Sequence, residues 1–176
     1  MIEKAKIHLL HRMPAGLGIP LGEAIDQCVE ALSAGYDGCL IPAGVDPSET
    51  QALDGFALAG LIAQQTQGGR IGLTDVSLSV LSPDEILRRA MVLTSLAPNR
   101  IDLGLSLGRP RDLWAGNVAA GRARRDFPLR LAAVLAAFGR TAADPAVRLE
   151  PAFRSIPRWP TDLVAPEVFI SGTYCA

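Results

Sequence analysis

Residues 82–107 read SPDEILRRAMVLTSLAPNRIDLGLSL, and this stretch decides the fold class. Its start is typical of a helix, because Ser82 can cap the first N–H groups and Pro83 fits the first helical position. Glu85, three residues after the serine, completes a capping box. Apolar residues then recur at helical spacing until a second proline ends the pattern. The apolar run 100–107 follows at once, so the stretch predicts a helix that leads directly into a strand.

The same unit recurs along the chain. The first four predicted strands start about 30 residues apart, which is the length of one strand–helix unit. Strands that are connected by helices run parallel, with right-handed crossovers. The predicted fold class is therefore α/β, either an open doubly wound sheet or part of a barrel. We predict strands at residues 6–10, 38–41, 70–80, 100–107 and 168–171, and helices that begin near residues 20, 53, 82 and 118.

The composition is that of an ordinary globular protein. Of the 176 residues, 49% are hydrophobic and 20% are charged, which suits one domain over residues 1–176. Within it we expect an irregular connection at 140–166 and a free tail at 172–176. No apolar run approaches the ~18 residues of a membrane span. The formal net charge of −1 favours neither nucleic acid nor a membrane surface as a partner.

The cysteines argue against a disulfide scaffold, because there are only three and the number is odd. Cys28 and Cys39 fall on predicted apolar positions and are expected to be small core residues. Because the sequence has no C-x-x-C pair, it predicts no zinc site. We expect a cytoplasmic location, since the N-terminal stretch does not have the pattern of a signal peptide.

Three consecutive stretches resemble the bacterial-luciferase-like family of flavin- or deazaflavin-dependent oxidoreductases. They are GYDGCLIP (35–42), DGFALAGLIAQQTQGGRIGLTDVSLSVLSP (54–83) and DEILRRAMVLTSLAPNRIDLGLSLG (84–108). Members of this family fold as barrels of eight strand–helix units. The resemblance therefore implies a partial (β/α) barrel of about five parallel units, related to the TIM barrel. A complete barrel takes about 250 residues, so we expect a C-terminally truncated relative, which also lacks the family's histidine-containing segment after the second strand.

Five parallel strands cannot close a barrel whose diameter is set by eight. The two outer strands would leave backbone N–H and C=O groups without partners. A second copy, a different subunit, or an open sheet capped by residues 140–166 would each resolve this. We expect self-association, as a homodimer or a larger assembly, because it needs no additional protein.

The carboxyl ends of the strands form the active edge of such a sheet, and three groups of polar residues are expected there. The first is His11, which is predicted to lie just past the first strand. An imidazole at that place could act as a catalytic general acid or base, or contact a flavin ring. The alternative interpretation is a histidine at the surface or at the edge of the core.

The second group is Asp75, Val76 and Ser77, within the third predicted strand. The resemblance implies that this strand carries a bulge with a non-proline cis peptide behind the flavin ring. That suggests a cofactor contact at these three residues. The alternative interpretation is that Asp75 faces solvent at the end of a strand.

The third group is Ser106, Gly108, Arg109 and Arg111, at the end of the fourth predicted strand. Glycine lets a backbone approach an anion closely, and arginine offers a bidentate fork of donors. The loop could therefore bind a cofactor phosphate or a carboxylate. The alternative interpretation is a solvated basic loop.

Two functions follow from the resemblance. The first is a luciferase-like oxidoreductase or monooxygenase that uses FMN or a deazaflavin on a small organic substrate. The second is a catalytically inactive relative that binds a partner or serves as a scaffold. A third interpretation, a doubly wound nucleotide-binding domain, rests on Gly16, Gly18 and Gly22, whose spacing is one residue too long for the dinucleotide motif.

Overall fold

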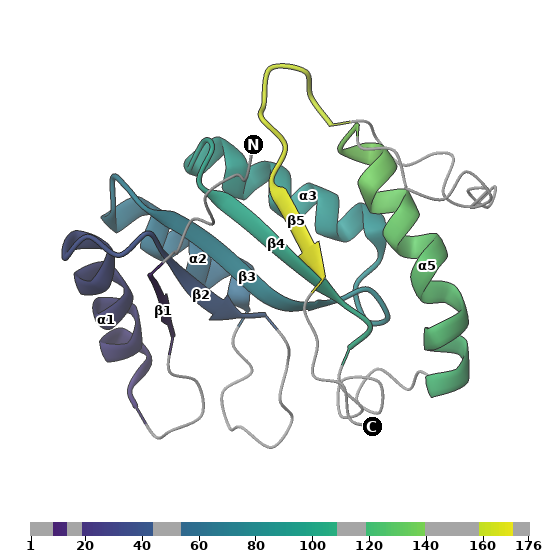
Figure 1. Ribbon diagram of the computed structural model, residues 1–176, viewed down its shortest axis with the longest axis horizontal. Coiled ribbons are helices and arrows are strands. Elements are labelled where there is room, and N and C mark those ends of the chain that lie inside the picture. The colour runs from purple at the N-terminus through teal and green to yellow at the C-terminus, as the bar shows by residue number, and fades with distance from the viewer. Residues whose placement is uncertain (1–8, 14–18, 44–53, 109–118, 140–158, 171–176) are drawn as a thin grey trace, which may run out of the picture.

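The computed structural model describes residues 9–13, 19–43, 54–108, 119–139 and 159–170, and every structural statement below concerns these residues. Strands and helices alternate along the chain (Figure 1). The prediction of an α/β fold with five parallel strands is confirmed. In chain order the elements are β1 (Leu10–Arg12), α1 (Leu21–Ser33), β2 (Gly38–Pro42), α2 (Gly55–Gln65), β3 (Arg70–Ser77), α3 (Pro83–Leu96), β4 (Ile101–Ser106), α5 (Ala120–Ala137) and β5 (Glu167–Ile170).

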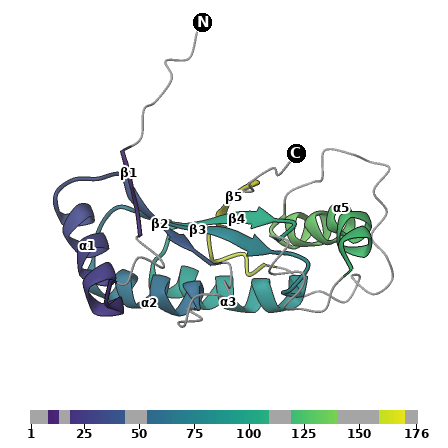
Figure 2. The ribbon, with the colours of Figure 1, turned by 90° about the horizontal axis from the view of Figure 1, so that it is seen from below.

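The order of the strands in the sheet distinguishes the two predicted architectures. It is β1-β2-β3-β4-β5, and every neighbouring pair is parallel. Helices α1, α2 and α3 lie on one face of the sheet, and α5 packs against α3 (Figure 2). A doubly wound sheet would reverse its strand order and carry helices on both faces. The doubly wound alternative is therefore wrong, and the arrangement is that of part of a barrel.

The helix ends follow local signals in the sequence. Ser82 caps α3, because its Oγ accepts a hydrogen bond of 3.2 Å from the N–H of Glu85. Gly35, with a φ of +96°, follows α1 in the left-handed conformation expected there. Asp54 caps α2 by accepting from the N–H of Phe56 at 2.9 Å, a cap that the sequence analysis missed. None of the helices described is both long and apolar enough to cross a bilayer.

Two of the strands differ from the prediction by more than one residue at an end. β1 covers Leu10–Arg12, whereas the predicted strand ended at residue 10 and lies largely outside the described residues. β3 ends at Ser77 instead of residue 80, because the chain turns back there and the N–H of Leu81 donates to the carbonyl of Ser77 at 2.9 Å. The apolar run after Ser77 belongs to this turn. Leu78 is fully buried within the turn, which explains why its sequence resembled a strand.

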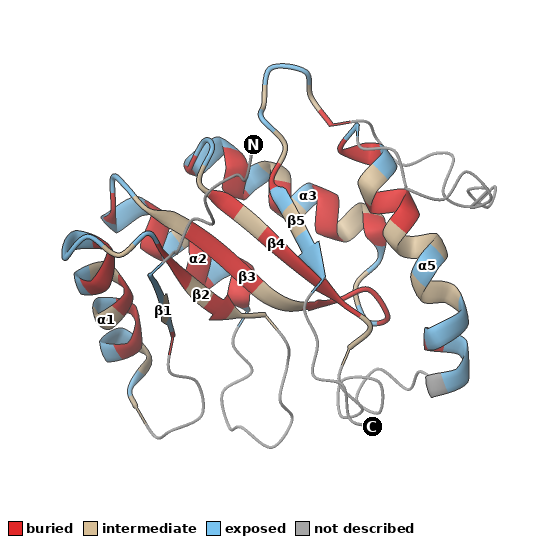
Figure 3. Ribbon diagram, in the orientation of Figure 1, coloured by how far each residue is buried: buried red, intermediate tan, exposed pale blue. Residues whose placement is uncertain are grey.

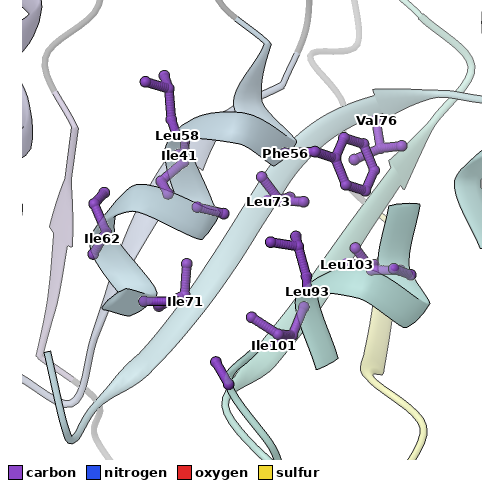
Figure 4. Close-up of a cluster of buried hydrophobic side chains, with 14 of the residues drawn as sticks. Ile41, Phe56, Leu58, Ile62, Ile71, Leu73, Val76, Leu93, Ile101 and Leu103 are labelled. Atoms are coloured by element: carbon purple, nitrogen blue, oxygen red, sulfur yellow. The ribbon is translucent and has the colours of Figure 1, made fainter. Parts of the chain in front are cut away.

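The core lies between the sheet and the helices. Successive residues of a strand point to opposite faces, and Ile71, Leu73 and Leu103 all point to the helix side. They meet the buried side chains of Ile62 and Leu93 from α2 and α3 (Figure 4). All five are at most 3% exposed. Burying each such side chain stabilises the fold by about 1.5–3 kcal/mol.

The opposite face of the sheet carries different residues. β1 and β5 are mostly exposed, whereas β3 and β4 between them are mostly buried (Figure 3). The ring of Phe169 lies over Gly104, where a Cβ would come within 2.6 Å of the ring. Arg70 also lies on this face and forms an ion pair with Asp102. In a closed barrel this face would be the interior.

Part of the predicted irregular connection is described. Residues 159–166 form turns without a helix or strand. The N–H of Trp159 donates to the carbonyl of Ala137 at 2.9 Å, and its ring packs edge-on against Phe138 at 4.9 Å between centroids. Residues 140–158 and 172–176 lie outside the described residues, so the division of the chain remains a prediction.

Candidate functional site

A bulge in β3 determines which side chains face which side of the sheet. Leu73 of β3 pairs with Leu103, but two residues further along β4, Leu105 pairs with Val76. β3 therefore contains one extra residue between these pairs. An extra residue reverses the alternation of side chains beyond it. As a result Ser77 lies beside Ser106 on the face opposite the helices.

This reversal separates the three residues predicted to contact a cofactor. The side chain of Val76 points to the helix side and is fully buried in the core. Its side chain therefore does not reach the carboxyl edge, and a cofactor contact through the backbone of Val76 stays a prediction. Ser77 lies at the edge but is only 6% exposed. Asp75 is half-buried within the bulge itself.

Asp75 makes the bend of the bulge. Its φ is +61°, in the left-handed region that side chains other than glycine rarely adopt. This conformation costs roughly 1–2 kcal/mol, and aspartate is among the residues that tolerate it best. The resemblance implied a cis peptide at this place, but every peptide bond in the described residues is trans. The expected strand therefore does contain a bulge, but its distortion is a left-handed residue at Asp75 and not a cis peptide bond.

Hydroxyl groups tie the turn after β3 to the end of β4. Ser79 Oγ donates to the carbonyl of Leu107 at 2.6 Å, and Ser77 Oγ lies 3.4 Å from the same oxygen. The N–H of Leu78 donates to the carbonyl of Ser106 at 2.9 Å. The turn after β3 and the end of β4 thus form one hydrogen-bonded unit at the carboxyl edge. The sequence analysis did not identify Ser79.

Arg130 holds the same unit from a third element. It lies on α5, and one of its guanidinium NH groups donates to the carbonyl of Leu78 at 2.6 Å. Arg130 was not among the residues predicted from the sequence. A signal was present, because Arg130 falls at helical spacing between Phe127 and Val134, on the face that α5 turns to the core. A charged residue in such a position needs a polar partner inside the molecule.

Ser106 and Gly108 shape the start of the third predicted group. The N–H of Gly108 donates to Ser106 Oγ at 3.2 Å. Gly108 has a φ of +100°, a conformation that favours glycine. Ser106 is only 4% exposed, so its hydroxyl stabilises the turn from a buried position. Arg109 and Arg111, predicted to bind an anion, lie outside the described residues.

The structure does not bring His11 to the other candidates. His11 lies in the middle of β1, not past its end, so the prediction of its place is wrong. It pairs with Cys39 of β2, a buried residue on the helix side of the sheet. The His11 ring contacts Tyr36 edge-on at 6.2 Å, and its buried Nε2 has no hydrogen-bond partner among the described residues. These are the surroundings of a histidine at the edge of the core.

Cys28 and Cys39 are both buried beneath β2, as predicted for core residues. Their thiols are hydrogen-bonded to each other. This bond, together with burial, raises the pKa of the Cys39 thiol far above its ordinary value. Cys39 is therefore a protonated, unreactive thiol at neutral pH.

A cavity of about 480 Å³ lies away from the carboxyl edge. It is lined by the end of α5 and by the chain that leads toward β5, including Phe138, Trp159 and Leu163. The described residues that line it include no acid or base. The cavity therefore does not coincide with the polar residues described above, and we assign the candidate site to the edge.

A match to a protein-family model shows the family of this chain. Residues 6–132 match the model described as luciferase-like monooxygenase. The chain belongs to this family. Among curated proteins of known function, none matches the sequence significantly. The resemblance seen in the sequence is thereby confirmed, and the bulge in β3 lies inside the matched region.

Solved structures of luciferase-like fold support the same architecture. Crystalline apo-MsnO8 has 23% identity and a TM-score of 0.67, over 96% of this chain and 50% of that one. The oxygenating constituent of 3,6-diketocamphane monooxygenase from Pseudomonas putida, in complex with FMN, has 15% identity, a TM-score of 0.57 and coverages of 69% and 38%. An F420-dependent secondary alcohol dehydrogenase with an F420-acetone adduct has 15% identity, a TM-score of 0.52 and coverages of 69% and 42%. The chain thus spans half or less of the length of these structures.

Proposed function

We propose that this chain acts as a luciferase-like oxidoreductase that holds FMN or a deazaflavin at the carboxyl edge of its sheet, against a small organic substrate. The observation that carries the proposal is the bulge in β3, which places a left-handed Asp75 and the buried Ser77 beside the end of β4. The family assignment and the cofactors named for two similar structures support it.

The described residues fit such a cofactor. The edge combines a bent backbone at Asp75, which a flat ring can approach, with a glycine turn at Gly108. Ser106 Oγ accepts a hydrogen bond within that turn, from the N–H of Gly108. Arg109 and Arg111 follow the turn in the sequence. We propose that these two arginines bind the cofactor's phosphate as bidentate donors.

The roles of the chain and of the cofactor are distinct. A flavin or deazaflavin supplies the hydride or oxygen chemistry when it is bound. The residues of this chain orient it, because Arg130, Ser79 and Ser106 hold the turn after β3 against the end of β4. A rigid edge of this kind reduces the ordering that binding would otherwise require.

Titration with FMN and with a deazaflavin tests the proposal. We expect binding of one of them with a dissociation constant below about 100 μM, which corresponds to −5.5 kcal/mol. Arg109→Gln should weaken binding by about 1.5–3 kcal/mol, the contribution of one charged hydrogen bond. Arg124→Gln, on the exposed side of α5, is the matched control and should leave binding unchanged. If neither cofactor binds at this concentration, the proposed oxidoreductase function is contradicted.

A scaffold or partner-binding protein is the second candidate. The observation that favours it is the sheet face opposite α1, α2 and α3. No described helix covers this face, and the two outer strands, β1 and β5, are mostly exposed. Such a face could bind a protein partner. Absence of cofactor binding together with a stable complex would support this function.

Self-association is a proposal that both functions share. An open parallel sheet leaves its outer strands ready to pair with another chain. Leu9 and Leu10 at β1 and Phe169 and Ile170 at β5 are exposed apolar residues, of the kind that contacts between subunits cover. We propose that two copies of the chain combine, and light scattering of the purified chain measures this directly.

A further inference from the structure

Two buried thiols meet between α1 and β2. Cys28 lies on the buried face of α1 and is 0% exposed, and Cys39 of β2 is 1% exposed. Cys39 pairs in register with Ile71, whose side chain points to the helices, so the thiol of Cys39 points to the same side as Cys28. The proposed function uses neither thiol, although both are potential nucleophiles.

The hydrogen bond between the two thiols makes them unequal. It lowers the pKa of the Cys28 thiol, against the opposite effect of burial, and it raises the pKa of the Cys39 thiol. Cys39 is therefore the donor of this bond, and Cys28 Sγ is the acceptor. Thiolate character makes a sulfur nucleophilic. Cys28 is thus the attacking sulfur of the pair, and Cys39 is the sulfur that holds a proton beside it.

A polar group beside Cys39 lacks a partner. His11 is the neighbour of Cys39 across the pairing of β1 with β2. Its Nε2 atom is buried and has no hydrogen-bond partner among the described residues. A buried nitrogen without a partner is unfavourable, and a small polar molecule would satisfy it. The surroundings of the pair therefore suit a polar molecule as small as hydrogen peroxide.

Helix α1 is attached in a way that allows the two sulfurs to approach. Within the described part of the chain, the side-chain hydrogen bonds of α1 stay inside the helix. By contrast, Arg130 anchors α5 to the carbonyl of Leu78. An S–S bond is about 2.0 Å long, which is shorter than a hydrogen-bond contact between sulfurs. Packed helices can shift by about 1–2 Å, and such a shift of α1 toward β2 would form the bond.

We propose that Cys28 and Cys39 are a dithiol that hydrogen peroxide oxidises to an intramolecular disulfide. The Cys28 sulfur attacks one peroxide oxygen, the O–O bond breaks, and the other oxygen leaves as water, so that Cys28 becomes a sulfenic acid. The Cys39 sulfur then attacks the Cys28 sulfur, and the hydroxide that leaves takes the Cys39 proton and becomes a second water. Two thiols lose two electrons, and one peroxide is reduced to two waters. This inference goes beyond the proposed function and does not rest on a cofactor.

Peptide mapping of the wild-type chain tests the disulfide directly. The folded protein is treated with hydrogen peroxide, the peroxide is removed with catalase, and the chain is unfolded in urea with iodoacetamide. Cleavage after glutamate then separates Cys28, in peptide 24–30, from Cys39, in peptide 31–49. We expect both alkylated peptides to be lost. In their place, a linked pair lighter by two hydrogen atoms than the sum of the free peptides should appear, and a reducing phosphine should separate it.

Single variants distinguish the roles of the two thiols. In Cys39→Ser, Cys28 has no sulfur partner and should proceed to a sulfinic acid, which the phosphine does not reverse. In Cys28→Ser, Cys39 keeps its proton and should be recovered as an alkylated thiol. Cys175→Ser, which removes the third cysteine of the sequence, is the matched control and should form as much linked peptide as the wild type. Circular dichroism checks that each variant is folded, and the wild-type map is decisive by itself if one is not.

Three results would overturn the inference. Recovery of both alkylated peptides from the peroxide-treated wild type would show that the folded chain does not form the bond. A linked pair that forms only when peroxide is added in urea would show the same. A linked pair that joins two copies, seen as a dimer on a non-reducing gel, would reject the intramolecular bond. Failure of the cofactor titration affects none of these outcomes, so the two proposals are tested separately.

Discussion

The amino edge of the sheet, where the strands begin, is held by charged side chains, whereas the carboxyl edge is held by hydroxyl groups and one arginine. At the amino edge, Asp37 accepts from the N–H of Leu9 at 2.8 Å, and Arg70 binds Asp102. At the carboxyl edge, Ser79 and Arg130 hold a turn that contains a distorted backbone. In barrel folds the first edge is typically used for stability and the second for chemistry.

Arg100 shows how the amino edge is stabilised. It lies just before β4 and donates four hydrogen bonds of 2.7–2.8 Å to the chain that follows α2. The acceptors are the carbonyls of Thr66, Gly68 and Gly69 and the hydroxyl of Thr66. A helix leaves its last carbonyls without partners. The guanidinium supplies a donor to the carbonyl of Thr66, the residue that ends α2, and to two carbonyls of the chain beyond it. Partial burial lowers the pKa of Arg100.

The largest effect is expected from Arg100→Met. Loss of the charged hydrogen bonds should reduce the free energy of unfolding by about 2–3 kcal/mol, measured by urea denaturation. The carboxyl edge is unchanged in this variant, so cofactor affinity should stay at the wild-type value. Arg88→Met is the control, since Arg88 is an exposed arginine whose ion pair contributes about 0–1 kcal/mol. Equal losses in both variants would show that Arg100 has no special role.

A smaller and local effect is expected from Arg130→Met. The carbonyl of Leu78 loses its charged donor, which should favour opening of the turn by about 2 kcal/mol. The N–H groups of Leu78 and Leu81, both bonded within this unit, should then exchange with solvent roughly thirtyfold faster. Hydrogen exchange followed by mass spectrometry measures this.

The conservative variant Arg130→Lys retains a donor and should recover part of the protection. Exchange at the amino edge, for example at the N–H of Ile71, should not change in either variant. Faster exchange over the whole sheet would instead identify Arg130 as a general stabilising residue.

The two left-handed residues provide a matched comparison of the edges. Asp75 lies at the carboxyl edge and Asn99 at the amino edge, and both have a φ of +61°. At either position, valine should be less stable than glycine by about 1 kcal/mol, because a β-branched residue is strained in this conformation. Thermal denaturation measures the difference. Only the two variants at Asp75 should also alter cofactor binding. Equal cofactor affinity in the valine and glycine variants of both positions would indicate that the cofactor binds elsewhere.

The smallest effect is expected at the cysteines, which lie beneath the sheet between its two edges. The raised pKa of Cys39 keeps its thiol protonated, and thiolate is the reactive form. Iodoacetamide at pH 8 should therefore not modify Cys39 in the folded chain, as read by mass spectrometry of its peptides. In urea the same thiol should react completely. Modification of Cys39 in the native protein would show that the sheet opens near β1.

Local signals made much of the fold predictable. The capping box at Ser82 and the glycine after α1 define helix ends without any tertiary contact. The repeat of strand and helix at a constant spacing predicted parallel strands. The end of β3 was not predictable in this way, because Leu78 and its neighbours are as apolar as a strand although they form a buried turn.

The candidate site depends more on contacts between distant residues. Whether Val76 or Ser77 faces the helices depends on how β3 pairs with β4, which lies about 30 residues away. The role of Arg130 requires a partner 52 residues earlier in the chain. His11 was assigned to the edge because its strand was expected to end sooner. A single sequence contains these positions but not the pairing that relates them.

The extra residue in β3 also has a consequence for comparing or engineering related proteins. Before it, odd-numbered positions of the strand point to the helices, and after it, even-numbered positions do. An alignment that omits one residue here would shift this frame and assign a serine to the helix side and a valine to the opposite face of the sheet. Any graft of this loop onto another barrel must carry the insertion with it, or the transplanted side chains will be inverted.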